Sequence, residues 1–123
     1  MLEHLNASAL KPTRVVILGA HGFVGGAAER LLRARGVPVL ALGRAELNLL
    51  SSDAPAALAR ALRPDDSLLV ISARAPVKDI AMLVENVRMM ENICRTLAAA
   101  APQHVIYISS DSDGAGQFDS DED

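Results

Sequence analysis

The sequence predicts an α/β fold in which helices cover both faces of an open parallel sheet of about four to five strands, three layers in all. Short apolar stretches rich in β-branched residues alternate with segments of helical spacing along the whole chain. A glycine-rich turn follows the first apolar stretch and opens the first helical segment. Strands buried on both faces read as continuous apolar runs, as these do, which favours a parallel sheet over an antiparallel one.

Two strands and one helix are predicted in the first part of the chain. After a polar leader over residues 1–13, the run Arg-Val-Val-Ile-Leu over 14–18 predicts a strand that stops at Gly19. Apolar side chains at helical spacing over 22–36 predict a helix, with a glycine as its C-terminal stop. The run over 37–42 predicts the second strand, with a proline near its start, where a missing N–H costs least.

The connection after the second strand is the least regular part of the pattern. A short strand over 47–50 is one interpretation of its apolar residues. A helix is then expected over 55–62, with Ser52 or Asp53 as its N-cap and a proline in its first turn.

The second part of the chain repeats the alternation of strand and helix. Strands are expected over 67–72 and 104–109, and the longest helix over about 77–100. Residues 111–123 consist largely of Gly, Ser and acidic residues, with little to bury, and predict a flexible acidic tail. The expected folded domain therefore spans residues 14–110.

Length and composition limit the class of protein. With 123 residues, 50% of them hydrophobic, the chain forms one small domain. No apolar run approaches the roughly 20 residues of a membrane helix, and no basic segment precedes an apolar core at the N-terminus. We therefore expect a soluble, unexported protein without a membrane partner. A single cysteine, Cys94, favours a reducing cytoplasm, and we expect it to be a buried helix thiol.

The distribution of charge and of histidines excludes two kinds of site. The net charge of −3 divides into a weakly positive body and an acidic tail, and no basic stripe suggests nucleic-acid binding. The three histidines have no Cys or carboxylate arranged with them at metal-ligand spacing, so we expect no metal site.

Three glycines at a spacing of three lie between the first strand and the first helix. Gly19 allows a tight turn out of the strand, Gly22 removes a Cβ where a pyrophosphate would approach the helix N-terminus, and Gly25 allows the helix to pack closely on the strand. This context predicts a dinucleotide-binding Rossmann fold. The other residues assigned to this loop of the binding site are His21, Phe23 and Val24.

The motif Gly19-x-x-Gly22-Phe23-x-Gly25 resembles the fingerprint of extended short-chain dehydrogenase/reductases, the group of nucleotide-sugar epimerases, dehydratases and reductases. The similarity continues over residues 40–49, where it is closest to relatives of dTDP-4-dehydrorhamnose reductase, and through Glu85-Asn86-Val87 and 105–111. It covers residues 14–111. The resemblance implies an NAD(P) cofactor and a nucleotide-sugar-like substrate, but it does not specify the substrate.

The residue that closes the second strand selects the cofactor in dinucleotide-binding folds. Arg44 stands there, and its guanidinium offers two parallel donors to a 2′-phosphate, which predicts NADP(H) over NAD(H). Glu46 could instead accept from a ribose 2′-hydroxyl, so NAD stays open. Where the family usually has an Asp at the adenine, this chain has Asn48, whose amide can also pair with an adenine edge.

The resemblance also assigns residues near the reacting end of the cofactor. Ala73, Arg74 and Ala75 stand where family members line the nicotinamide-side ribose. Ser110 stands at the position of the family's substrate-orienting Ser or Thr, and Asn86 matches its helix Asn. These are the candidate catalytic residues.

The family's catalytic Tyr-x-x-x-Lys has no counterpart. Tyr107, the only tyrosine, is expected to pack in the last strand, and Asp111 follows it four residues later. Without the acid, a factor of about 10²–10⁴ in rate is lost, so we expect an inactive cofactor-binding part, truncated before that motif. The alternatives are a complete, non-catalytic NADP(H)-binding sensor or assembly module and a structural protein with a vestigial site. We also expect a homodimer, formed through the long helix or the exposed last strand.

Overall fold

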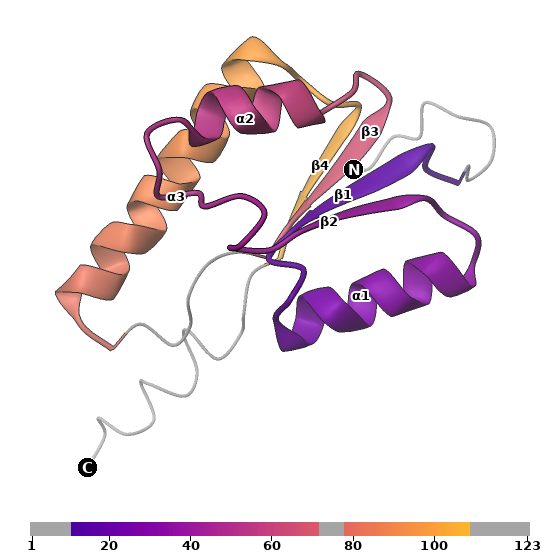
Figure 1. Ribbon diagram of the computed structural model, residues 1–123, viewed down its shortest axis with the longest axis horizontal. Coiled ribbons are helices and arrows are strands. Elements are labelled where there is room, and N and C mark those ends of the chain that lie inside the picture. The colour runs from indigo at the N-terminus through magenta and orange to yellow at the C-terminus, as the bar shows by residue number, and fades with distance from the viewer. Residues whose placement is uncertain (1–10, 72–77, 109–123) are drawn as a thin grey trace, which may run out of the picture.

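The fold is that of a computed structural model, which describes residues 11–71 and 78–108. Strands and helices alternate along the chain (Figure 1). Their bounds are β1 (Arg14–Leu18), α1 (Phe23–Ala34), β2 (Val39–Leu42), α2 (Ala54–Ala61), β3 (Asp66–Val70), α3 (Ile80–Ala99) and β4 (His104–Tyr107). All strand pairs are parallel, and their order across the sheet is β2-β1-β3-β4. The predicted parallel α/β fold is confirmed.

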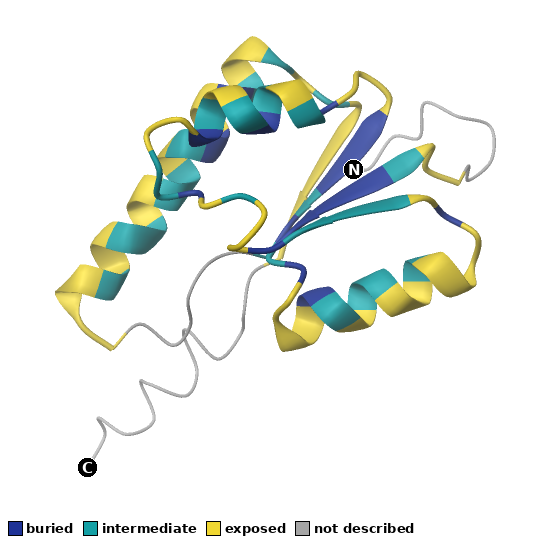
Figure 2. Ribbon diagram, viewed as in Figure 1, coloured by how far each residue is buried: buried dark blue, intermediate teal, exposed yellow. Residues whose placement is uncertain are grey.

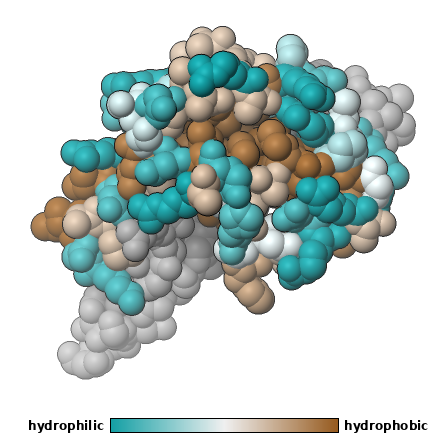
Figure 3. Space-filling model, viewed as in Figure 1, coloured by the Kyte–Doolittle hydropathy of each residue, from teal (hydrophilic) through white to brown (hydrophobic). Residues whose placement is uncertain are grey.

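The three layers follow from the alternation of side chains along β1. Val15 and Ile17 point to the face covered by α1, whereas Val16 and Leu18 point to the face covered by α2 and α3 (Figures 1 and 2). All four side chains are buried, so β1 contributes to two separate apolar clusters. Figure 3 shows apolar surface gathered in the middle of the viewed face, between the α2–α3 layer and α1.

The two outer strands differ from the central ones in burial. Every residue of β4 is exposed, and Val105, Ile106 and Tyr107 are each about half exposed (Figure 2). In the part of the chain that the structure describes, β4 pairs with β3 on one side only, so it forms a sheet edge, as expected.

Two elements begin later than the sequence predicts. β2 begins at Val39 rather than at residue 37, although the carbonyl of Pro38 still accepts from the Val15 N–H at 2.9 Å. α3 begins at Ile80 rather than near residue 77, because Asp79 is its N-cap and accepts from the Met82 N–H at 2.9 Å.

The segment over 47–50 is a turn region, so the interpretation of a short strand there is wrong. Its backbone is held by side chains instead of by a neighbouring strand. Asn48 Oδ1 accepts from the Leu50 N–H at 3.0 Å, and Asn92 of α3 donates to the carbonyl oxygens of Leu49 and Ser51 at 2.7 and 3.3 Å. These contacts close the segment against α3.

The N-terminus of α2 confirms one part of the prediction and not the other. Asp53 is the N-cap, and Pro55 lies in the first turn. The Asp53 side chain makes no cap hydrogen bond, because it accepts from the Ser51 hydroxyl.

Cys94 is exposed, so the expectation of a buried thiol is wrong. The core-facing positions of this part of α3 are Ile93 and Thr96. Successive helical residues are about 100° apart, which turns the residue after Ile93 away from the core.

A buried ion pair joins the amino ends of β1 and β3. Arg14 donates from Nε to Asp66 Oδ1 at 2.8 Å and from Nη2 to Oδ2 at 2.6 Å, and the Arg63 N–H also donates to Oδ2, at 2.8 Å. Burial raises the pKa of Asp66, but the hydrogen bonds from Arg14 and from the Arg63 N–H outweigh it, so the pKa lies below its ordinary value. The sequence pattern alone does not predict this pair, because its two residues are far apart along the chain.

Candidate functional site

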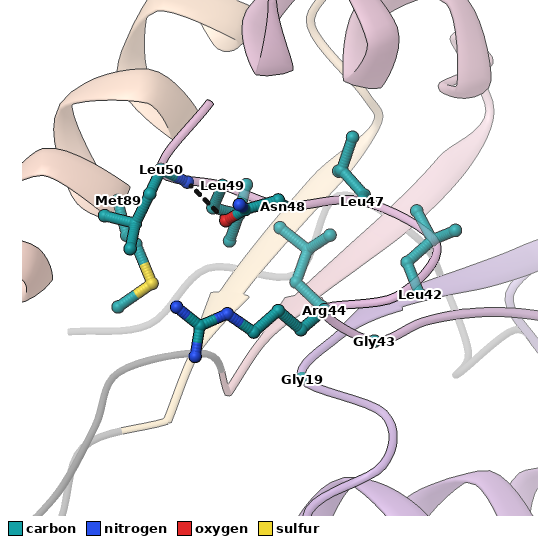
Figure 4. A pocket seen from close by; sticks show the side chains of 10 residues that line it. Gly19, Leu42, Gly43, Arg44, Leu47, Asn48, Leu49, Leu50 and Met89 are labelled. Atoms are coloured by element: carbon teal, nitrogen blue, oxygen red, sulfur yellow. Dashed lines mark hydrogen bonds between the residues drawn. The ribbon is translucent and has the colours of Figure 1, made fainter. Parts of the chain in front are cut away.

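A cavity opens at the carboxyl ends of β1 and β2, with a volume of about 160 Å³ (Figure 4). It lies where open parallel sheets bind ligands, outside the carboxyl ends of the strands. Most of its lining is apolar, with backbone from the glycine loop and a few polar side chains. The lining residues are Leu18, Gly19, Leu42, Gly43, Arg44, Leu47, Asn48, Leu49, Leu50 and Met89.

Two glycines of the loop, Gly19 and Gly25, have the backbone geometry that the sequence predicts for them. Gly19 has a φ of 89°, in the left-handed region that other residues avoid. Gly25 is buried, and a Cβ there would overlap the carbonyl oxygen of Gly19 and lie 2.9 Å from Ala20 Cα. The close packing predicted for Gly25 is confirmed, while the role of both residues in binding stays a prediction.

The N-terminus of α1 is open to an anion. Its N-cap is Gly22, which makes no side-chain cap hydrogen bond, and its first turn contains no acidic residue. The backbone N–H groups there and the positive end of the helix dipole suit a phosphate. Among the residues that the structure describes, a Cβ at Gly22 would meet only the carbonyl oxygen of Gly19, at 3.6 Å, so packing against them does not explain this glycine.

The other predicted loop residues face solvent rather than the cavity. Phe23 is 90% exposed and Val24 is 50% exposed. Phe23 and His21 instead line a shallower, polar hollow at the glycine loop and the first part of α1, whose other lining residues are Ala20, Gly22, Gly26, Glu29, Arg30 and Arg33. The structure therefore brings Gly19, Arg44 and Asn48 to one cavity and leaves the Phe23 ring outside it.

One side-chain contact links the glycine loop to the turn after β2. Glu46 Oε1 accepts from the Gly43 N–H at 2.7 Å and lies 2.9 Å from His21 Nε2. The hydrogen bond from the Gly43 N–H, with that from His21, lowers the pKa of the Glu46 carboxyl. The His21 ring lies directly over Gly43, where any Cβ would overlap it.

Arg44 and Asn48 both lie in the turn region after β2. Arg44 extends toward the side of the cavity where Leu50 and Met89 lie (Figure 4). The side-chain oxygen of Asn48 is engaged by the Leu50 N–H, so a ligand would meet this residue as an amide donor.

Sequence reasoning missed the apolar part of the cavity. Leu47, Leu49, Leu50 and Met89 line it, and Asn92 fixes the backbone that carries three of them. The apolar run after Asn48 was the available signal, but it was interpreted as a strand.

The remaining predicted site residues do not line the cavity or are not described by the structure. Asn86 lies on α3, one turn before Met89. Ala73, Arg74, Ala75 and Ser110 lie outside the described residues.

Over 11–71 and 78–108, no group of three or more His, Cys, Asp and Glu residues could hold a metal ion. Over the same ranges, no helix is long and apolar enough to cross a membrane.

We compared the chain with protein families, with curated proteins and with solved structures. A family model described as the NAD dependent epimerase/dehydratase family matches residues 15–122. No curated protein matches the sequence.

Three solved structures resemble the fold. The protein DdhaC has a TM-score of 0.72 at 18% identity, over 85% of this chain and 32% of its own. GDP-mannoheptose C4 reductase from Campylobacter jejuni, with NADP bound, has a TM-score of 0.66 at 18% identity, over 81% and 31%. GDP-L-fucose synthetase from Naegleria fowleri, bound to NADP, has a TM-score of 0.64 at 15% identity, over 81% and 31%. The chain thus spans about a third of the length of these proteins.

Proposed function

The chain belongs to the NAD dependent epimerase/dehydratase family, and from this premise we propose that residues 14–110 form an NAD(P)-binding Rossmann domain for chemistry on a nucleotide-sugar-like substrate. The observation that carries the proposal is the cavity at the carboxyl ends of β1 and β2, which adjoins the glycine loop. Two solved structures with this fold contain NADP, and they are nucleotide-sugar reductases or synthetases by name, which supports the same cofactor and substrate class.

The residues present fit a dinucleotide. The N-terminus of α1 at Gly22 would hold the pyrophosphate, and Gly25 brings that helix close to the backbone of Gly19 and Ala20, directly after β1. The apolar walls of the cavity would enclose an adenine, with Asn48 as a donor to its edge. When bound, a nicotinamide dinucleotide supplies hydride transfer.

Calorimetric titration of the chain with NADPH and with NADH, in the same buffer and salt, tests the proposal. Saturable binding of either dinucleotide supports it. If the chain binds neither dinucleotide, the proposal is contradicted, and the glycine loop has a structural role only. Gly22→Val serves as the matched variant, because its side chain would occupy the space proposed for the pyrophosphate, while its Cβ meets only Gly19 among the described residues.

Replacing Arg44 by alanine is expected to lower NADPH affinity about tenfold, the size typical of one charge-assisted hydrogen bond to an ion. NADH affinity should change little, because NADH has no 2′-phosphate for the guanidinium to bind. The two affinities are measured by calorimetry at fixed salt. Arg60→Ala is the control, since Arg60 lies in the last turn of α2 and does not line the cavity. An unchanged ratio in Arg44→Ala would contradict the proposed NADP preference.

We also propose that these 123 residues bind the cofactor without efficient turnover. They contain no Tyr-x-x-x-Lys, and Tyr107 lies on β4 with its side chain half exposed. Ser110 and Asn86 would orient substrate and water if the missing Tyr and Lys were supplied.

The second candidate function is a non-catalytic NADP(H) sensor or assembly module, favoured by the exposed apolar residues of α3 and β4. Nucleotide-dependent association, measured by light scattering, would favour that candidate.

The first half of α3 has an exposed apolar face, which supports the expected homodimer. Its members are spaced as one helical face and are 41% to 79% exposed: Ile80, Leu83, Val84 and Val87. Light scattering should give about twice the mass of 13.0 kDa, and Leu83→Lys should return it to the monomer value. A wild-type mass near 13.0 kDa would contradict the dimer. If Leu83→Lys stays dimeric, the β4 edge becomes the candidate interface.

A further inference from the structure

The turn after β2 carries two groups that would select opposite coenzymes. Arg44 offers donors to a 2′-phosphate, whereas a carboxylate at the end of this strand accepts from a 2′-hydroxyl in NAD-binding folds. Glu46 supplies such a carboxylate two residues after Arg44, and it hydrogen bonds to the N–H of Gly43, the first residue after β2.

Two donors engage the Glu46 carboxylate. Its Oε1 atom accepts from the Gly43 N–H at 2.7 Å and lies 2.9 Å from His21 Nε2. The Gly43 contact is local to the turn, but His21 comes from the glycine loop, 25 residues away in the sequence. The His21 ring can take this position because Gly43 has no Cβ.

We propose that His21 is a specificity-determining residue, which favours the phosphorylated coenzyme by holding Glu46 and so leaving Arg44 to bind the 2′-phosphate. This inference rests on the proposed dinucleotide binding. Glu46 is exposed, and without His21 only the Gly43 N–H would still hold its carboxylate, which leaves the carboxylate freer to move toward the ribose. There it would accept from a 2′-hydroxyl and repel a 2′-phosphate, which shifts the preference toward NADH.

The experiment measures the ratio of NADPH to NADH affinity, by calorimetry, in four forms of the chain. His21→Ala should lower the ratio about threefold to fivefold. This is the size typical of one exposed charge–charge interaction, here between the Glu46 carboxylate and the 2′-phosphate. Glu46→Gln keeps an acceptor oxygen for Gly43 and His21 but removes the charge, so the ratio should not fall. In the double variant the effect of His21→Ala should vanish, because the released side chain is no longer a carboxylate.

The control is Glu29→Gln, which removes another carboxylate from the hollow that His21 lines. Glu29 lines the same hollow and pairs with Arg33, and its loss should leave the ratio unchanged. Amide exchange at Gly43 is a second readout that needs no ligand. It should accelerate in Glu46→Ala and stay near the wild-type rate in Glu46→Gln, whose amide oxygen can still accept.

The outcomes separate this inference from the proposed function. If the wild-type chain binds neither dinucleotide, the proposed function fails, and the inference fails with it. If it binds and His21→Ala leaves the ratio unchanged, only the inference is overturned. An equal fall of the ratio in the Glu46→Gln background would also overturn it, because His21 would then act on the ligand without Glu46.

Discussion

Replacing Gly25 by alanine is expected to lower the free energy of unfolding by about 3 kcal/mol, at the upper end of what overpacking costs. The new Cβ would overlap the carbonyl oxygen of Gly19 and lie 2.9 Å from Ala20 Cα. Both contacts are with backbone, which cannot move aside as a flexible side chain can, so α1 must shift away from β1. Urea denaturation measures the loss, and calorimetry should show dinucleotide binding lost at the same time.

Gly26→Ala is the matched control for this change. Gly26 is the next residue of the same helix, but a Cβ there would meet only the end of the Arg30 side chain, at 3.4 Å, and the Ala20 carbonyl oxygen, at 3.7 Å. Alanine is favoured over glycine within a helix by about 1 kcal/mol, so this variant should be as stable as wild type or more stable. Equal destabilisation by both variants would contradict the close-packing role of Gly25.

Replacing Asp66 by alanine is expected to cost about 3–5 kcal/mol, as when one partner of a buried ion pair is removed. Asp66 is fully buried, and its carboxylate accepts from Arg14 and from the Arg63 N–H. Its loss leaves the largely buried Arg14 guanidinium without its hydrogen-bonded carboxylate. A domain of this size has a total stability of about 5–15 kcal/mol, so the variant should unfold at far lower urea concentration.

Asp65→Ala is the control, because Asp65 is the preceding residue and is exposed. It should change stability by less than about 0.5 kcal/mol. The double variant Arg14→Met/Asp66→Leu should be more stable than Asp66→Ala, since it leaves no unpaired charge in the core. Similar stabilities for Asp66→Ala and Asp65→Ala would contradict the importance of the pair.

The same pair makes stability depend on pH in the acid range. Because the pKa of Asp66 is lower in the folded chain than in the unfolded chain, the unfolded chain binds the proton first. The contribution of the carboxylate is therefore complete above its unfolded pKa, about 3.9, and is lost as pH falls through the lower, folded value. Urea midpoints from pH 5 to pH 2 should fall more steeply for wild type than for Asp66→Asn.

The sequence predicted those parts of the fold in which local pattern and burial agree. After their polar first residues, β1 and β3 continue as the apolar runs 15–18 and 68–70, because both of their faces are covered, and the helices between the strands follow from apolar spacing. The segment over 47–50 was interpreted wrongly because what holds it is Asn92, about forty residues later. Cys94 was placed wrongly because the core-facing side of α3 depends on where α2 lies.

The candidate site was predictable where a backbone requirement shows in the sequence. Gly19 and Gly25 could be assigned from spacing alone, since a positive φ and a close helix contact both require glycine. The contact between His21 and Glu46 could not, because it depends on how two turns meet in space. The apolar wall given by Met89 likewise depends on the packing of α3 against the segment after β2.

The pairing of β1 with β3 also determines how the chain can reach this fold. Arg14 and Asp66 are register partners although 52 residues separate them, so the centre of the sheet forms only when a long loop closes. Chains dominated by such distant pairings fold more slowly than helical bundles, whose contacts are local. During synthesis, β1 is made before β3, so the apolar side chains on one face of β1 would stay uncovered until β3 pairs with it. The interval before closure is when the chain is most exposed to aggregation.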